Sequence, residues 1–337
     1  MKKRVLGRTG LEVSELSYGA AFVTAGESGF AGAAPLIRAV LESGINLIDT
    51  SADYGRSEAG VGEGLRHENR PVVLCTKIGP RDGTFDPKQG KKLRQTVEES
   101  LRLLGRDSID VLMIHEPDRP AQIDWWDDMR KYTGPVVDTL SELKEKGTIR
   151  FTGLGGTTAY EIVPIIATGF YDVLLTAFNY SLLWREAALE VIPEAKKQRM
   201  GIMLGSPTQQ GWLAHRYDEQ LRSATLRHIN SPRRKQLLEL YRLVDEVGVP
   251  IAELALRWAL MNQDASTVLT GAKNIVQLEQ NLKAAHDGPL PGQVMERIDE
   301  IAAMVPFRPH EEPFLCPFYN PDFDLLKRPG PAVRFER

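Results

Sequence analysis

Four residues whose side chains could move a proton stand at or just beyond the ends of three short apolar segments. Asp49 closes one segment, and Tyr54 follows it. Lys77 closes the next segment and His115 closes the third. A phenol has an ordinary pKa of about 10, so it exchanges a proton near neutrality only where a neighbouring cation stabilises the phenolate. We expect Lys77 to be that cation.

The other two residues complete a proton donor aimed at a carbonyl group. Asp49 would pair with the ammonium of Lys77 and keep it charged, since a buried ammonium needs a partner. A neutral His115 would hydrogen-bond a substrate oxygen and set its orientation. No side chain supplies hydride, so the sequence predicts hydride transfer from a bound cofactor, with Tyr54 as acid/base.

Short β-branched segments alternate with amphipathic stretches of helical length along the whole chain. This alternation is typical of βαβ units and a parallel sheet, and the fully apolar middles suit strands covered on both faces. Eight such segments predict a (β/α)8 TIM barrel, whose catalytic groups lie at the C-terminal ends of the strands. The predicted strands are Leu16–Tyr18, Asn46–Asp49, Val72–Lys77, Ile109–His115, Arg150–Leu154, Val173–Phe178, Gly201–Gly205 and Thr267–Leu269.

Cap and turn residues support the helices between these strands. Asp86-Pro87 and Ser231-Pro232 each place a capping side chain before a first-turn proline. Residues 88–104 carry an apolar stripe that would face the barrel. Glycines stand where left-handed residues end helices, at Gly44, Gly147, Gly169 and Gly248.

Three features exceed a minimal barrel, besides extra helices. Lys3–Ser14 has hairpin character around Thr9-Gly10, and Glu116–Tyr132 is an insertion rich in Trp and Asp. The tail Phe307–Arg337 carries several aromatic residues, which favours a loop packed over the barrel mouth. With no flexible linker visible, we expect one barrel domain over residues 1–337, with 307–337 as a C-terminal extension.

The composition excludes several classes of protein. Hydrophobic residues make up 42% and charged residues 26%, which suits a folded core. A net charge of -3 without a basic stripe argues against nucleic acid and anionic membranes as partners. The N-terminus lacks a signal-type apolar core, so we expect a cytoplasmic protein. Cys75 and Cys316 lack CxxC spacing and the histidines lack ligand spacing, so no metal is expected. A homo-oligomer stays open.

The chain resembles the aldo-keto reductase superfamily from about Leu6 to Ala285. Six ordered segments carry the resemblance: LGRTGLEVSELSYG, GINLIDTSADYGRSEAGVGEGL, VVLCTK, SIDVLMIHEPD, ELALRWAL and VLTGAKNIVQLEQN. The resemblance implies NAD(P)(H)-dependent hydride transfer to or from an aldehyde, ketone or sugar. The family's catalytic tetrad falls on Asp49, Tyr54, Lys77 and His115.

A coenzyme site is expected around the last predicted strand. Gly271 to Asn274 precede a helix whose N-terminus suits a phosphate group. The resemblance places the adenosine end there, with Gln280 and Asn281 at the adenine. The full set of expected coenzyme contacts is Gly156, Thr157, Asn179, Ser206, Gly211, Gly271, Lys273, Gln277, Gln280 and Asn281.

The chain departs from the family pattern around the nicotinamide. Gly156-Thr157 stand where many relatives carry Ser-Asn, and Asn179 replaces a Gln. The aromatic residue that often stacks on the ring corresponds to Gly205, for which Tyr180 would compensate. Gln277 replaces the usual Arg at the 2′-phosphate, which weakens the case for NADP(H). On family grounds NADP(H) stays slightly ahead of NAD(H).

Substrate specificity in this barrel comes from loops, and aromatic residues there suit a sugar or a small aldehyde. The same rings suit loops that pack on themselves. The candidate substrate residues are Tyr18, Trp125, Trp126 and Trp184. The alternative function is a nicotinamide-binding regulatory subunit, such as a channel partner, with vestigial or slow reductase activity.

Overall fold

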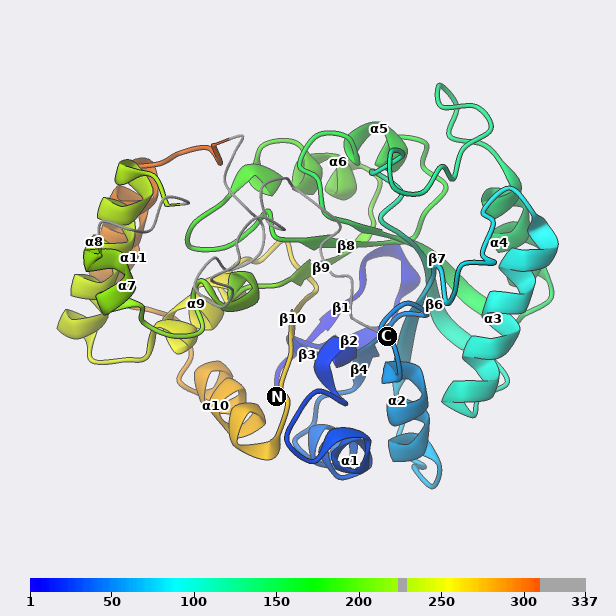
Figure 1. Ribbon diagram of the computed structural model, residues 1–337, viewed down its shortest axis with the longest axis horizontal. Coiled ribbons are helices and arrows are strands. Elements are labelled where there is room, and N and C mark those ends of the chain that lie inside the picture. Colours follow the sequence, from blue (N-terminus) through cyan, green and yellow to red (C-terminus); the bar gives the residue numbers. More distant parts are fainter. Residues whose placement is uncertain (224–228, 310–337) are drawn as a thin grey trace.

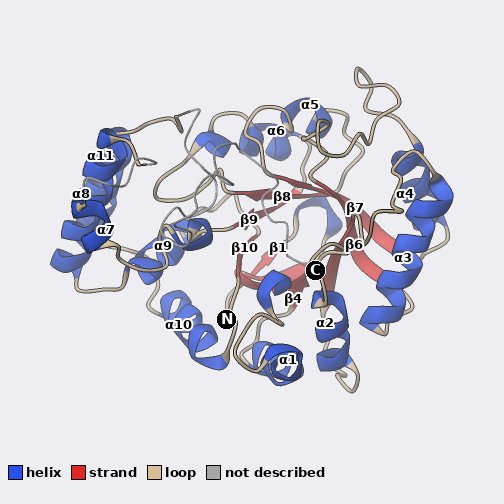
Figure 2. Ribbon diagram, in the orientation of Figure 1, coloured by secondary structure: helices blue, strands red, loops and turns tan. Residues whose placement is uncertain are grey.

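Parallel strands close into a barrel in the computed structural model, which describes residues 1–223 and 229–309 (Figure 1). The order around the barrel is β10-β3-β4-β5-β6-β7-β8-β9, and helices cover its outside (Figure 2). This confirms the predicted (β/α)8 fold. The barrel strands are β3 (Leu16–Gly19), β4 (Leu47–Asp49), β5 (Val73–Ile78), β6 (Ile109–His115), β7 (Ile149–Gly156), β8 (Val173–Ala177), β9 (Gly201–Gly205) and β10 (Thr267–Thr270).

The helices form an outer ring with an added group at one side. In Figure 1, α7, α8 and α11 lie together beyond the ring, and α8 packs against both of the others. The helices are α1 (Ala33–Glu42), α2 (Ser57–Leu65), α3 (Gly90–Leu104), α4 (Pro135–Glu145), α5 (Val163–Ile166), α6 (Val191–Lys197), α7 (Asp218–Arg222), α8 (Ser231–Val247), α9 (Ile251–Leu260), α10 (Ile275–His286) and α11 (Gly292–Ala303).

The barrel strands lie within two residues of the predicted bounds at every end. The four C-terminal glycines are also confirmed, each with φ between 73° and 88°. Two predicted helix starts are wrong. α3 begins at Gly90 because the Asp86 carboxylate accepts from Lys88 N and closes a turn before the helix. Asn230, rather than Ser231, caps α8 by accepting from Arg233 N at 2.9 Å.

The predicted N-terminal hairpin is confirmed and closes the N-terminal end of the barrel. β1 (Lys3–Val5) and β2 (Glu12–Ser14) pair antiparallel, and Leu6 joins the apolar cluster that fills the barrel. Gly7 has φ +50, and a Cβ there would lie 2.1 Å from Gly201 N. Only glycine permits this close approach, so the hairpin segment around Gly7 packs tightly against the start of β9. The site must therefore open at the other end.

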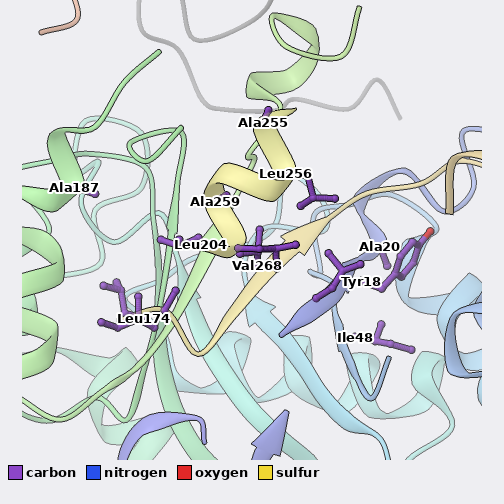
Figure 3. Close-up of a cluster of buried hydrophobic side chains, with 14 of the residues drawn as sticks. Tyr18, Ala20, Ile48, Leu174, Ala187, Leu204, Ala255, Leu256, Ala259 and Val268 are labelled. Atoms are coloured by element: carbon purple, nitrogen blue, oxygen red, sulfur yellow. The ribbon is translucent and has the colours of Figure 1, made fainter. Parts of the chain in front are cut away.

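Helix α9 shows how the outer layer is fixed to the sheet. Leu256 and Ala259 lie near Val268 of β10, with Leu204 of β9 beside it, and Ala255 lies farther along the same helix (Figure 3). All five side chains are buried, and the two alanines let the helix approach the strands closely. Because such interiors are tightly packed, α9 is fixed against β10 at Val268.

The other two predicted additions are the insertion after β6 and the C-terminal tail. Glu116–Tyr132 contains no helix or strand and is joined to the next residues by one bridge, Asp128 to Thr133. The tail prediction, with Phe314, Phe318, Tyr319 and Phe323, lies outside the described residues. None of the helices in the described part combines the length and the apolar character needed to cross a membrane.

Candidate functional site

Three neighbouring strands bring the predicted quartet to one rim. Asp49 ends β4, Lys77 is the penultimate residue of β5 and His115 ends β6. These strands pair in parallel, so their C-terminal ends meet on the same side of the barrel. Tyr54 lies in the loop after β4, where its N–H donates to Ser51 O at 3.2 Å.

Lys77 and Asp49 form a buried ion pair. Lys77 Nζ donates to Asp49 Oδ2 at 2.7 Å and to Thr50 O at 2.7 Å, and the two side chains are 1% and 5% exposed. Burial raises the pKa of Asp49, and the ammonium offsets part of that rise. Removing one partner of such a pair costs about 3–5 kcal/mol, because the other charge stays buried. The pair therefore fixes the lysine side chain.

The ring of Tyr54 lies close to both this ion pair and His115. Lys77 Nζ is 4.9 Å from the centroid of the Tyr54 ring, and the ring meets His115 edge-on with centroids 5.5 Å apart. Burial raises the pKa of Tyr54 well above its ordinary value, and the charges of Asp49, Asp53 and Glu116 raise it further. Burial and these charges favour the protonated phenol, which is the form that can give a proton.

His115 has a carboxylate partner that the sequence reasoning missed. Its Nδ1 lies 2.8 Å from Asp53 Oδ2, and Ser51 Oγ donates to Asp53 Oδ1 at 2.5 Å. The pKa of His115 is above its ordinary value: burial would lower it, but the Asp53 charge and hydrogen bond outweigh burial. The signal was available, because an acidic residue stands directly before Tyr54 in the sequence.

The turn after β7 holds the first residues expected at a nicotinamide. Asp118 Oδ2 accepts from Thr157 N at 2.9 Å and from Thr158 N at 2.7 Å. A Cβ at Gly156 would lie 3.1 Å from Asp118 Oδ2 and 2.8 Å from Ile162 Cδ1. Asp118 and Ile162 thus crowd the space that a side chain at position 156 would need. Sequence reasoning missed Asp118 because it treated the residue as part of the insertion.

Asn179, after β8, has its amide nitrogen committed to the backbone. Nδ2 donates to Thr157 O at 2.9 Å and to Ala177 O at 3.0 Å. These bonds tie the β8 loop to the turn after β7 and set the side-chain oxygen as an acceptor. Tyr180 stacks on Trp258 of α9 with centroids 4.7 Å apart. This contact uses its ring in outer packing, in place of the expected nicotinamide contact.

Several residues on this rim adopt left-handed backbone conformations that ordinary side chains avoid. Glu116, Phe178 and Ser206 directly follow β6, β8 and β9, with φ values of 50°, 69° and 56°. Gln210 has φ 48° and precedes Gly211, whose φ is 117°. Such residues cost about 1–3 kcal/mol each and cluster at functional sites. The backbone at the C-terminal rim is therefore shaped at an energetic cost.

The loop between β10 and α10 carries the remaining expected coenzyme residues. Asn274 caps α10 by accepting from Gln277 N, and Gln277 Oε1 accepts from Lys273 N, each at 2.9 Å. Asn281 Nδ2 donates to Gly271 O at 3.2 Å. The exposed Lys273 reaches the Phe22 ring, and Gln280 is exposed on the helix. The loop thus presents a capped helix N-terminus beside one cation.

The four aromatic residues considered for substrate contact are all buried, at 3% exposure or less. Tyr18 donates its hydroxyl to Ala272 O at 2.7 Å, which ties it to the β10 loop. Trp126 donates to Pro117 O, Trp125 meets Phe85 edge-on, and Trp184 meets Trp212 edge-on. Between the two roles that the sequence left open, burial favours packing. Among the described residues, no cluster of His, Cys, Asp or Glu could hold a metal ion.

Comparisons with known proteins agree with this fold. The sequence model of the Aldo/keto reductase family matches residues 15–303. L-galactose dehydrogenase from Arabidopsis thaliana is 28% identical, covering 90% of this chain and 93% of that protein. A probable voltage-gated potassium channel subunit beta from the same plant is 27% identical, covering 92% and 99%. The holo form of an aldo-keto reductase from Bacillus halodurans has a TM-score of 0.74 at 27% identity, covering 90% and 96%.

Proposed function

The chain belongs to the aldo/keto reductase family, and from that premise we propose that it transfers hydride between a nicotinamide coenzyme and an aldehyde, ketone or sugar, with Tyr54 as acid/base. The protein is an oxidoreductase, as family membership and its relatives indicate. One observation supports the specific proposal most strongly. The Lys77–Asp49 ion pair, with its 2.7 Å contact, and the edge-on ring of His115 both lie close to the ring of Tyr54.

In the reduction direction, Tyr54 is the proton donor. A bound reduced nicotinamide supplies hydride to the carbonyl carbon. The carbonyl oxygen takes the phenolic proton, so that one C–H and one O–H bond form as the carbonyl is reduced. The raised pKa of Tyr54 keeps the phenol protonated before the reaction. The Lys77 ammonium, 4.9 Å from the centroid of the ring, would stabilise the phenolate left behind. Solvent returns the proton.

The residues of the β7 to β10 loops fit a dinucleotide. The acceptor oxygen of Asn179 suits the N–H groups of a carboxamide, and the N-terminus of α10 suits a phosphate. Ser206 and Gly211 follow β9 on the same rim, both with positive φ. On family grounds we propose NADP(H) as the favoured coenzyme. NAD(H) is the second candidate, because the uncharged Gln277 offers no cation to a 2′-phosphate. Michaelis constants for both coenzymes decide this, and equal or better use of NAD(H) overturns the preference.

A second candidate is a coenzyme-binding regulatory subunit with slow turnover. It is favoured by the similarity to a protein named as a probable potassium channel subunit beta. The complete quartet of Asp49, Tyr54, Lys77 and His115 favours the enzyme, because a regulator has no need of a proton donor. We propose that the protein is cytoplasmic and that its partner is a small-molecule substrate. A homo-oligomer is compatible with the family.

The test is a steady-state screen of aldehydes and sugars in both directions with each coenzyme, on wild type and Tyr54→Phe. We expect one class of substrate to turn over and the variant to lose about 10²–10⁴-fold in kcat. The variant should bind coenzyme as wild type does, by quenching of protein fluorescence. Equal rates for the two proteins would remove the assigned role of Tyr54 and favour the regulatory candidate.

A further inference from the structure

Asp53, directly before Tyr54, lies outside the four residues of the proposed proton donor. We propose that Asp53 is a positioning residue, which holds His115 through Nδ1 so that the charged ring offers Nε2–H to the substrate oxygen. This inference rests on the proposed carbonyl reduction and adds a specific role to it. The structure supports it through the contacts of one carboxylate with two neighbours.

The contacts fix which nitrogen of His115 carries a proton. An ionised carboxylate only accepts hydrogen bonds, so the 2.8 Å contact requires a proton on Nδ1. In a neutral ring Nε2 would then be an acceptor, and it could not donate to a carbonyl oxygen. In a charged ring Nε2 carries a proton as well and becomes a strong donor. Ser51 holds the other carboxylate oxygen of Asp53 at 2.5 Å, which fixes its orientation.

The surrounding charges favour the charged ring. Burial lowers the pKa of His115, and Lys77 lowers it too, but Asp53 and then Glu116 outweigh both. Burial would raise the pKa of Asp53, yet His115, Ser51 and Lys77 together bring it below its ordinary value. The groups facing the imidazole are Asp53 and Ser51 from the loop after β4, Asp49 from β4, Tyr54, Lys77 from β5 and Glu116 beside it in the chain.

The rim thus holds two separate pairs of opposite charge, both next to Tyr54. Asp49 neutralises Lys77 at 2.7 Å, and Asp53 neutralises His115 at 2.8 Å. The first pair is fully buried, whereas the side chains of the second are 14% and 22% exposed, which leaves the imidazole within reach of a substrate. The carbonyl oxygen would meet a phenol on one side and a charged imidazole on the other.

The first test reads the imidazole itself, by ¹⁵N NMR of wild type, Asp53→Asn and the matched control Asp299→Asn on α11. A His115→Gln spectrum assigns the signals. We expect a proton on Nδ1 in wild type and a titration above the ordinary range of histidine. Asp53→Asn should move the titration to lower pH, and Asp299→Asn should not. A wild-type ring protonated only at Nε2, or an unchanged titration in Asp53→Asn, would overturn the proposal.

The second test is kinetic. Asp53→Asn should lower kcat for carbonyl reduction about 10–100-fold, the effect typical of a residue that orients an imidazole, while the KM for coenzyme stays unchanged. The loss of activity at high pH should begin at lower pH, and Asp53→Glu should restore part of the rate. A wild-type kcat and pH profile in Asp53→Asn would overturn the positioning role. If wild type reduces no carbonyl, the proposed function fails, and the NMR result still decides the pairing.

Discussion

The rim of the barrel divides into two arcs that are built by different means. From β4 to β6, charged side chains hold one another: Asp49 with Lys77 and Asp53 with His115. From β7 to β10, the shape comes from the backbone, with left-handed residues after β8 and β9 and a turn after β7 that the Asp118 carboxylate holds. We propose that the first arc serves proton transfer and that the second holds the coenzyme.

The two arcs owe their rigidity to different interactions. An ion pair with 1% and 5% exposed side chains is fixed by its own electrostatics, once strands place it. Left-handed backbone must be held by other contacts, as when Gln209 Nε2 donates to Phe178 O at 2.8 Å. Substitutions in the first arc should therefore lower stability and catalysis, whereas substitutions in the second arc should weaken coenzyme binding.

Lys77→Met should have the largest effect, because it removes the cation from the first arc. Asp49 would be left as a buried, unpaired charge, which costs about 3–5 kcal/mol of unfolding free energy. Carbonyl reduction should fall to background at the same time. Urea unfolding and steady-state rates measure the two losses.

The matched control is the double variant Lys77→Met with Asp49→Leu, which removes both charges. It should recover much of the stability and none of the activity, since an apolar replacement of a buried pair is often tolerated. Wild-type stability in the single variant would mean that the pair does not hold the first arc together.

Gly156→Ala tests the second arc and should have an intermediate effect. The new Cβ would press on Ile162 at 2.8 Å and on the Asp118 carboxylate at 3.1 Å, so the turn must shift at a cost of about 1–3 kcal/mol. We expect a raised KM for coenzyme, with kcat changed much less. Gly83→Ala is the control, since its Cβ would meet nothing within 4 Å. A fall in kcat alone would contradict the division into two arcs.

The pairing of Asp53 with His115 should give the smallest effect, a pH-dependent contribution to stability of about 1 kcal/mol, because solvent weakens partly exposed pairs. The folded pKa of His115 is raised above 6.5, so this contribution is lost as pH rises through that raised pKa. The folded pKa of Asp53 lies below 3.8, so the same contribution to stability is also lost as pH falls through that lowered pKa.

Thermal unfolding of wild type and Asp53→Asn across pH measures this contribution. The difference in stability should be largest between pH 3.8 and 6.5, where both groups are charged in the folded and unfolded chain. A difference that stays constant from acid to alkaline pH would show that the two side chains do not form an ion pair.

The barrel and the identity of the first arc were predictable from the sequence. Apolar segments flanked by turn residues gave strand bounds within two residues, and their ends indicated Asp49, Lys77 and His115. The state of Tyr54 was not predictable. Its pKa depends on burial and on Asp53 and Glu116 together, and the sequence does not give the distances between them.

The second arc was harder to predict, because side-chain type says little about strained backbone. The residue types of Phe178 and Ser206 do not indicate a positive φ. The role of Asp118 depends on its contact with Thr157, which follows the next strand of the barrel. The tryptophans were ambiguous for a similar reason. Trp125 and Trp126 suit a sugar or a packed loop equally until their burial is known.

The most direct test of the central claim is a single-turnover experiment. Enzyme loaded with reduced coenzyme is mixed with an aldehyde that it turns over, and the loss of reduced nicotinamide absorbance is followed in wild type and Tyr54→Phe. We expect a fast single phase in wild type and one slowed at least about 100-fold in the variant, with coenzyme affinity unchanged. Equal single-turnover rates would contradict the assignment of Tyr54 as the proton donor.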